Sequence, residues 1–200
     1  LQMGWDILPE STGALYAPQL VDRFGWNLGL SHPSAEGANA RVTALLNQRF
    51  VPYLVRVGLK KSDTGSIEQY SWFFLPPALE DEPKKLGGDQ NFYRPEVQKL
   101  WAEGVAHRIK NLPKYSPVIY NLGDENFFSA EGAYGPSDEQ YFREFVKSKY
   151  GSIDALNREW RSAYKSFDEV PHLSLQAARE AGNFAAWFNH RQYSEKMYAD

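Results

Sequence analysis

The sequence of 200 residues contains no cysteine. Disulfides, thiolate zinc sites and thiol nucleophiles are therefore excluded, whereas any cellular compartment is compatible with this absence. Long apolar runs are also missing, since none approaches the roughly 20 residues that a membrane-spanning helix requires. Leu1 to Gly4 lack the layout of a signal peptide. We therefore expect them to be the interior of a longer chain or a processed start.

Clusters of basic residues are equally scarce. The net charge is −3, and Lys and Arg gather only in short pairs such as Lys60-Lys61 and Lys84-Lys85. This argues against nucleic acid and against an anionic membrane surface as partners. Neither GxGxxG nor the Walker pattern follows any apolar run, so a nucleotide-binding fold loses its main support and no cofactor is expected.

No metal is expected either, because the histidines show no spacing typical of metal ligands. They are His32, His107, His172 and His190.

Aromatic residues, in contrast, are plentiful. Six Trp, twelve Tyr and twelve Phe make up 15% of the chain. Sugar-binding clefts use such rings because the apolar face of a pyranose stacks on them, and large cores use them as well. Composition leaves both uses open.

Apolar runs typical of strands alternate with helical patterns along the chain. We expect strands near residues 4–9, 26–31, 51–58 and 117–123, and helices near 12–24, 34–49, 95–112, 137–150, 152–161, 174–182 and 183–198. Ser137-x-x-Gln140 is predicted to be a capping box, and Ser174 an N-cap. The segment 59–94 is too long for an ordinary connection, which favours a functional or mobile loop.

Four βα units in this order indicate an α/β protein with a parallel sheet. Four units could form half of an eight-stranded barrel, in which catalytic groups lie at the carboxyl ends of the strands. The run 117–123 ends on Asp124 and Glu125, so these carboxylates are candidates for such groups. The alternative is that the pair begins a solvated loop or caps a helix.

The residues after this pair carry the most specific pattern in the chain. Residues 142–160, from Phe142 to Trp160, resemble the "F-x-x-W-L-x-x-K-Y-G-S-L-x-A-L-N-x-x-W" segment of glycoside hydrolase family 42, the β-galactosidase-like enzymes. Residues 167–171 stand where the family has its "D-E-V" element, and the similarity continues through 182–200.

The resemblance implies a clan A glycosidase on a (β/α)8 TIM barrel that hydrolyses β-linked sugars with retention. In that clan the general acid/base glutamate ends the fourth strand, and counting units along this chain puts Glu125 there. A retaining glycosidase needs a protonated acid at the leaving oxygen and a carboxylate nucleophile about 5–5.5 Å away.

The sequence departs from the family in three places. Asp124 stands where the clan usually has an asparagine that contacts the sugar 2-hydroxyl, so that contact could pass to Asn121 or Asn126. The zinc-binding cysteines of many members cannot exist here. The nucleophile is expected at the end of strand seven, beyond the fourth unit, and we set aside as substitutes Glu10, Glu36, Glu131 and Glu169.

We therefore expect the chain to be the N-terminal half of the catalytic barrel within a longer protein, with the nucleophile outside these residues. A half-barrel that needs a partner is the alternative, although it would expose two parallel sheet edges.

Three further side chains are candidates for contacting substrate. Arg56, at the end of the third strand, could orient Glu125 or bind a hydroxyl, or could form a salt bridge to a neighbouring strand. Trp72 and Tyr134 lie on long loops where sugar platforms are built, although loop aromatics also pin their own loops. Trp101 and Trp160 have apolar neighbours at helical spacing and are expected in the core.

The function predicted from the sequence is a retaining glycoside hydrolase, β-galactosidase-like, with Glu125 as acid/base and a carbohydrate substrate. The isolated chain is expected to be inactive because it needs the C-terminal half of the barrel. Family members are often trimers, which leaves a homo-oligomer open. The alternative function is a non-catalytic carbohydrate-binding or assembly module on a degenerate glycosidase barrel.

Overall fold

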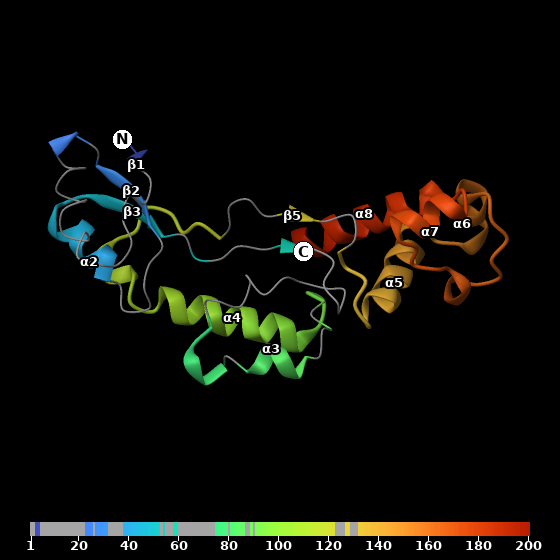
Figure 1. Ribbon diagram of the computed structural model, residues 1–200, viewed down its shortest axis with the longest axis horizontal. Coiled ribbons are helices and arrows are strands. Elements are labelled where there is room, and N and C mark those ends of the chain that lie inside the picture. Colours follow the sequence, from blue (N-terminus) through green and yellow to red (C-terminus); the bar gives the residue numbers. More distant parts are fainter. Residues whose placement is uncertain are drawn as a thin grey trace. The chain divides into compact units, whose positions relative to one another are not determined.

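A computed structural model describes residues 3–4, 23–25, 27–31, 38–52, 54, 58–59, 75–79, 81–86, 89, 91–122, 127–128 and 132–200 (Figure 1). The chain divides into two compact units. The first unit comprises residues 1–57, 70–80 and 100–126, and the second unit comprises 58–69, 81–99 and 127–200.

The first unit contains a parallel sheet whose strands follow one another in sequence order. β1 (Met3–Gly4), β2 (Leu28–Ser31) and β3 (Arg49–Pro52) lie side by side, with Met3 opposite Leu28 and Leu28 opposite Arg49. Parallel neighbours joined by crossover helices are what the alternation of strand and helix patterns predicted. β2 and β3 begin within two residues of the expected positions.

Residues 118–121 run along the other side of β3. The Val118 N–H donates to the Phe50 carbonyl at 3.1 Å, and the Asn121 N–H donates to the Pro52 carbonyl at 3.0 Å. The Leu54 N–H donates a hydrogen bond of 2.9 Å to the Asn121 carbonyl. Because one residue both donates to and accepts from positions two apart on its neighbour, this is the hydrogen-bond pattern of parallel strands. Residues 118–121 of the predicted strand 117–123 are therefore the next neighbour of β3, although only Asn121 forms a bridge and the described residues of this run do not make a regular strand.

The core of the first unit joins helices to this sheet. Ala40 of α2 (Ala38–Leu45), Phe50 of β3, Leu54 and Leu112 are buried together. Trp101, Val105 and Ile109 of α4 (Pro95–Ile109) and Tyr115 of η4 (Pro113–Tyr115) pack against them. Pro95 is the first residue of α4, where its missing N–H costs nothing. The predicted helix near 95–112 is confirmed, and Trp101, predicted to lie in the core, is partly buried against it.

The second unit is mainly helical. Its helices are α3 (Glu82–Lys85), α5 (Asp138–Tyr150), α6 (Ile153–Trp160), η5 (Phe167–Glu169), α7 (Leu175–Glu180) and α8 (Phe184–Ala199). Two short strands, β4 (Gly58–Leu59) and β5 (Phe127–Phe128), pair in parallel. A short helix, η3 (Pro77–Leu79), belongs to the first unit.

An aromatic core holds α5, α6 and α8 together. Phe142 and Val146 of α5, Leu156 and Trp160 of α6, and Tyr193 and Met197 of α8 are buried in one cluster. Trp160 is therefore a core residue, as predicted. At 0% exposure, Leu156 and Phe142 each contribute about 1.5–3 kcal/mol relative to an exposed side chain.

Side-chain caps start the later helices of this unit. The Ser174 hydroxyl accepts from the Ala177 N–H at 3.2 Å, which confirms the predicted cap of α7. Ser152 and Asn183 cap α6 and α8 in the same way. Gly151, with φ of +70°, ends α5 in a conformation that side chains rarely adopt.

The predicted capping box at Ser137 is wrong, although α5 does begin at the expected place. Ser137 has helical dihedrals (φ −89°, ψ −11°), whereas a capping side chain requires an extended residue. Its hydroxyl donates instead to the Asp89 carboxylate at 2.6 Å, and Gln140 donates to Glu144 at 3.0 Å. A charged acceptor makes the stronger hydrogen bond.

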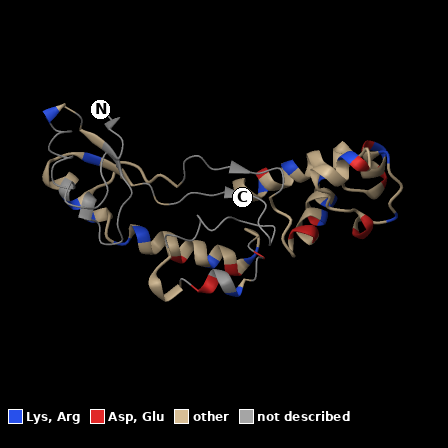
Figure 2. Ribbon diagram, in the orientation of Figure 1, with Lys and Arg blue, Asp and Glu red and all other residues tan. Residues whose placement is uncertain are grey.

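Acidic and basic residues both occur along α4, α5, α6 and α8 (Figure 2). Among the described residues, no helix combines the length and the apolar character needed to cross a membrane.

The cap of α6 predicts a measurable loss of stability. Ser152→Ala should lower the free energy of unfolding by about 1 kcal/mol, because the Ala155 N–H loses its acceptor. Ser148→Ala, at an exposed position inside α5, is the matched control and should have little effect. Denaturant unfolding followed by circular dichroism measures both. Equal stability of the two variants would contradict the assigned cap.

Candidate active site

Five of the seven predicted site residues lie outside the described residues. They are Arg56, Trp72, Asp124, Glu125 and Asn126. Their predicted roles stay predictions, and the described site consists of the elements around them in the chain.

Asn121 is the predicted site residue that the sheet positions directly. Both of its backbone groups are bonded to the chain at the end of β3, through the Pro52 carbonyl and the Leu54 N–H. Glu125 follows four residues later in the sequence. The two candidate carboxylates thus follow, in sequence, a position that the backbone hydrogen bonds to the sheet fix.

Tyr134 packs against two histidines of the second unit. Its ring stacks on His190 with centroids 4.2 Å apart and lies 4.6 Å from His172. Its hydroxyl donates to the Leu173 carbonyl at 2.9 Å. These contacts anchor the segment before α5, which is the second of the two roles considered for this loop aromatic. A role as a sugar platform stays a prediction.

His190, which is buried, and His172, which is partly buried, form a pair that the sequence did not indicate. His172 Nε2 lies 2.7 Å from His190 Nδ1, and His172 stacks on Phe142 at 4.2 Å. Burial lowers the pKa of both imidazoles, and each is further lowered by nearby positive charge. The contact needs one nitrogen to donate and the other to accept, so protonating both rings breaks it. His190 Nε2 is buried without a hydrogen-bond partner among the described residues.

No group of three or more His, Asp and Glu side chains that could hold a metal ion occurs among the described residues. His172 and His190 instead form a contact between two neutral imidazoles with aromatic rings around them.

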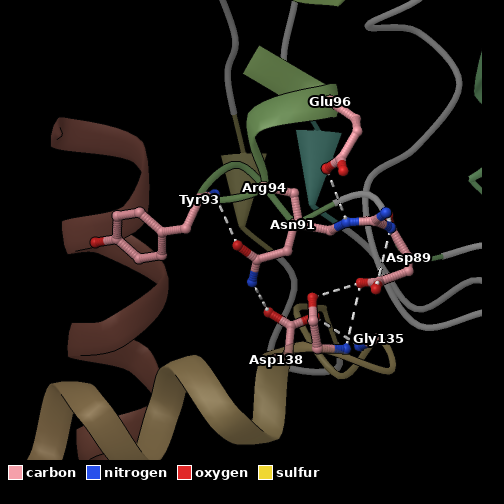
Figure 3. A network of polar contacts seen from close by, with 8 residues as sticks. Asp89, Asn91, Tyr93, Arg94, Glu96, Gly135 and Asp138 are labelled. Carbon is pink, nitrogen blue, oxygen red and sulfur yellow. Dashed lines mark hydrogen bonds and ion pairs between the residues drawn. The ribbon is translucent and has the colours of Figure 1, made fainter. Parts of the chain in front are cut away.

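A second buried polar cluster centres on Asp138, the first residue of α5 (Figure 3). One of its oxygens accepts from the Asn91 amide at 2.6 Å and from the Tyr193 hydroxyl at 2.8 Å. The other accepts from the Gly135 N–H at 2.6 Å. Burial raises the pKa of Asp138 to about 6 although these three donors favour the ionised form.

Asp89 extends this cluster toward the surface. It accepts from the Ser137 hydroxyl and N–H, and it forms an ion pair of 3.1 Å with Arg94 (Figure 3). Arg94 also contacts Glu96 at 3.5 Å. The end of the long segment 59–94 is thereby bonded to the start of α5. We call Asn91, Asp138 and Tyr193 together the Asp138 node.

The sheet of the first unit, with parallel strands in sequence order and α2 between β2 and β3, defines an α/β protein. The chain belongs to glycoside hydrolase family 42, a family described as β-galactosidase, whose sequence pattern matches residues 84–199. The matched range contains all but the last residue of the three stretches on which the resemblance rested.

Three curated proteins illustrate the relationship. The β-galactosidase BgaA of a Thermus species is 28% identical over 117 residues, which cover 50% of this chain and 17% of that protein. An Arthrobacter β-galactosidase is 29% identical over 92 residues (42% and 13%), and a Thermus thermophilus β-galactosidase is 27% identical over 117 residues (50% and 17%). The matched part thus spans less than a fifth of the length of these relatives.

The histidine pair predicts an acid-sensitive second unit. Below the ordinary histidine pKa of about 6.5, the unfolded chain binds two protons that the folded pair excludes, so its stabilisation is lost as pH falls. Asp138 acts in the opposite direction, because its contribution to folding stability is present below pH 3.8 and is lost as the pH rises through about 6. Two histidines against one aspartate leave a net difference of one proton. The free energy of unfolding should therefore fall by about 1.4 kcal/mol for each unit by which the pH is lowered from about 6 to 3.8.

Denaturant unfolding of His172→Gln between pH 7 and pH 4 tests this account. Removing one of the two histidines should reduce the acid slope by about 1.4 kcal/mol per pH unit, whatever the variant's stability at pH 7. An unchanged slope would contradict the exclusion of protons from the pair.

Proposed function

We propose that the protein is a retaining glycoside hydrolase that acts on β-galactosides, with Glu125 as its general acid/base. The observation that carries the proposal is the backbone pairing of residues 118–121 with β3. It supports the assignment of this run as the fourth parallel strand, and family membership supplies the expectation that the acid/base glutamate ends that strand.

The proposed architecture is a (β/α)8 barrel of which residues 1–200 supply the first four βα units. The sequential order of β1, β2 and β3 supports this reading. So does the position of residues 118–121 as the next neighbour. Sequential parallel neighbours are required in a barrel of this type, whereas doubly wound sheets change direction at a switch point.

In the proposed mechanism Glu125 protonates the glycosidic oxygen as the bond to the sugar breaks. A second carboxylate attacks the anomeric carbon from the opposite face and forms a glycosyl-enzyme, and Glu125 then takes a proton from the water that hydrolyses it. We propose that this nucleophile comes from outside residues 1–200. The aligned stretch is only 17% of the length of its Thermus relatives, which leaves ample chain for it.

The remaining predicted site residues are proposed to bind the sugar. Asp124 occupies the position where the clan usually has an asparagine, and an ionised carboxylate can accept hydrogen bonds from sugar hydroxyls but cannot donate them. Asn121 and Asn126 can do both. Arg56, Trp72 and Tyr134 are proposed to complete the site with a donor and two ring faces.

Glu125→Gln in the full-length protein tests the acid/base assignment. The rate of hydrolysis of galactosides with poor leaving groups should fall by about 10² to 10⁴-fold, because the leaving oxygen is no longer protonated. Galactosides with good leaving groups, such as nitrophenolates, should lose much less in the bond-breaking step. Steady-state and single-turnover rates on both substrate types measure the difference.

Glu131→Gln is the matched control, because it makes the same change six residues further along the same segment. It should leave both rates near those of the unsubstituted protein. Equal loss on both substrate types in Glu125→Gln would contradict the acid/base role. An unsubstituted full-length protein that binds galactosides without hydrolysing them would instead favour the carbohydrate-binding module.

A further inference from the structure

A groove of about 550 Å³ lies on the second unit, between α5 on one side and η5 with the start of α6 on the other. Small-molecule sites have volumes of roughly 300–1,000 Å³, so this groove can hold a ligand of that size. All of its lining residues belong to the described stretch 132–200 within the second unit. Asn121 and Tyr134, the described residues of the predicted site, do not line it. η5 lies in the "D-E-V" element at 167–171, to which no function has been assigned so far.

One wall of the groove is a polar stripe of α5. The stripe consists of four side chains at positions i, i+3, i+4 and i+7, namely Gln140, Arg143, Glu144 and Lys147. Residues at this spacing lie on the same face of a helix, and seven residues at about 1.5 Å each make the stripe about 10 Å long. The wall therefore presents hydrogen-bond donors and acceptors in a row.

Arg143 ties this wall to the element opposite. Its Nε donates to the Val170 carbonyl at 3.0 Å, and Val170 is the buried residue that directly follows η5. Its Nη2 donates to Glu139 at 2.6 Å, and Gln140 donates to Glu144 at 3.0 Å. The two walls are thus joined in the free protein, which lowers the cost of ordering the groove when a ligand binds.

The opposite wall combines an apolar surface with a charge. Phe167 of η5 and Ile153 of α6 are half-buried and pack against the aromatic core. Asp168 is exposed, as is Lys147 across the groove. Neither of these two side chains has a hydrogen bond or ion pair among the described residues. Both can therefore bond to a ligand without breaking a contact within the protein.

The polarity of the groove fits a neutral saccharide. Two positive side chains, Arg143 and Lys147, face two negative ones, Glu144 and Asp168, so neither an anion nor a cation is favoured by net charge. An apolar ligand would deprive these charged groups of water without replacing it. Sugar hydroxyls can donate to the carboxylates and accept from the cations, and such charge-assisted bonds are the stronger ones. The apolar face of a pyranose can lie on the Phe167 ring.

We propose that this groove is a second saccharide-binding site of the protein, which holds a short galactoside between α5 and η5. Its ligand class, galactosides, rests on the proposed function, whereas the site itself does not involve Glu125. The groove recruits sugar and contributes no catalytic group. Because water competes for every hydrogen bond at this exposed site, we expect a dissociation constant on the order of 1 mM.

Lysine acetylation of the full-length protein, measured by mass spectrometry, tests this proposal. The probe is thiodigalactoside, a disaccharide whose sulfur bridge resists hydrolysis. At ten times the dissociation constant it fills about nine in ten sites, so the acetylation rate of Lys147 should fall about fivefold or more. Lys165 is also exposed but does not line the groove, and its rate should not change. Mannitol, a polyol without a ring, should protect neither lysine.

Asp168→Asn and Phe167→Leu identify the groups that hold the sugar. The first removes a charged acceptor at an exposed position, and the second removes the ring face but keeps an apolar side chain against the core. Each should raise the concentration of thiodigalactoside that half-protects Lys147 about tenfold. Asp154→Asn, the same change at an exposed position of α6 outside the groove, is the matched control and should leave that concentration unchanged.

Lys147 that is not protected, or that is protected no more than Lys165, would overturn the proposed site. Protection by inorganic phosphate but not by thiodigalactoside would overturn it as well, because the groove would then bind anions. None of these results bears on the leaving-group test of Glu125→Gln. Failure of that test would overturn the proposed hydrolase, and protection of Lys147 would still identify a sugar-binding groove.

Discussion

The parallel backbone pairing between β3 and residues 118–121 is the constraint from which the account of the site follows. Two hydrogen bonds on the backbone of Asn121 fix the direction and register of a run that otherwise has little around it, since Ile119 and Leu122 are 62% and 60% exposed. Register matters here because a slip of one residue would turn every later side chain to the opposite face. Asp124 and Glu125 follow Asn121 within four residues in the sequence, so the proposed acid/base role depends on this register.

In the second unit, a charged side chain is buried beside a large aromatic core. Asp138 is fully buried next to Tyr193, yet it receives three hydrogen bonds from three parts of the chain. His190 is buried and His172 partly buried among rings, and the two imidazoles contact each other. The two clusters share Tyr193, whose hydroxyl serves the first and whose ring lies edge-on to His172 at 5.7 Å. Polar contacts of this kind select one arrangement of helices where apolar packing alone tolerates several.

Local sequence patterns predicted much of this fold and little of its polar chemistry. Pro95 at the start of α4, the cap at Ser174 and the buried Trp160 are confirmed because each depends on neighbours within a turn or two. The capping box predicted at Ser137 was wrong because the hydrogen-bond acceptor of its hydroxyl, Asp89, lies 48 residues away. The Asn91–Asp138 contact spans 47 residues and Asp138–Tyr193 spans 55, so no periodicity contains them. Glu125 was identified from the family motif and the strand count, and its role as general acid/base stays a proposal.

A crystal structure of the full-length protein with a bound galactose analogue tests the central claim most directly. The account predicts that the carboxyl group of Glu125 faces the glycosidic oxygen and lies about 5–5.5 Å from a second carboxylate on the other side of the anomeric carbon. A Glu125 side chain that points away from the sugar, or a carboxylate pair separated by about 6.5–9.5 Å as in inverting enzymes, would contradict it.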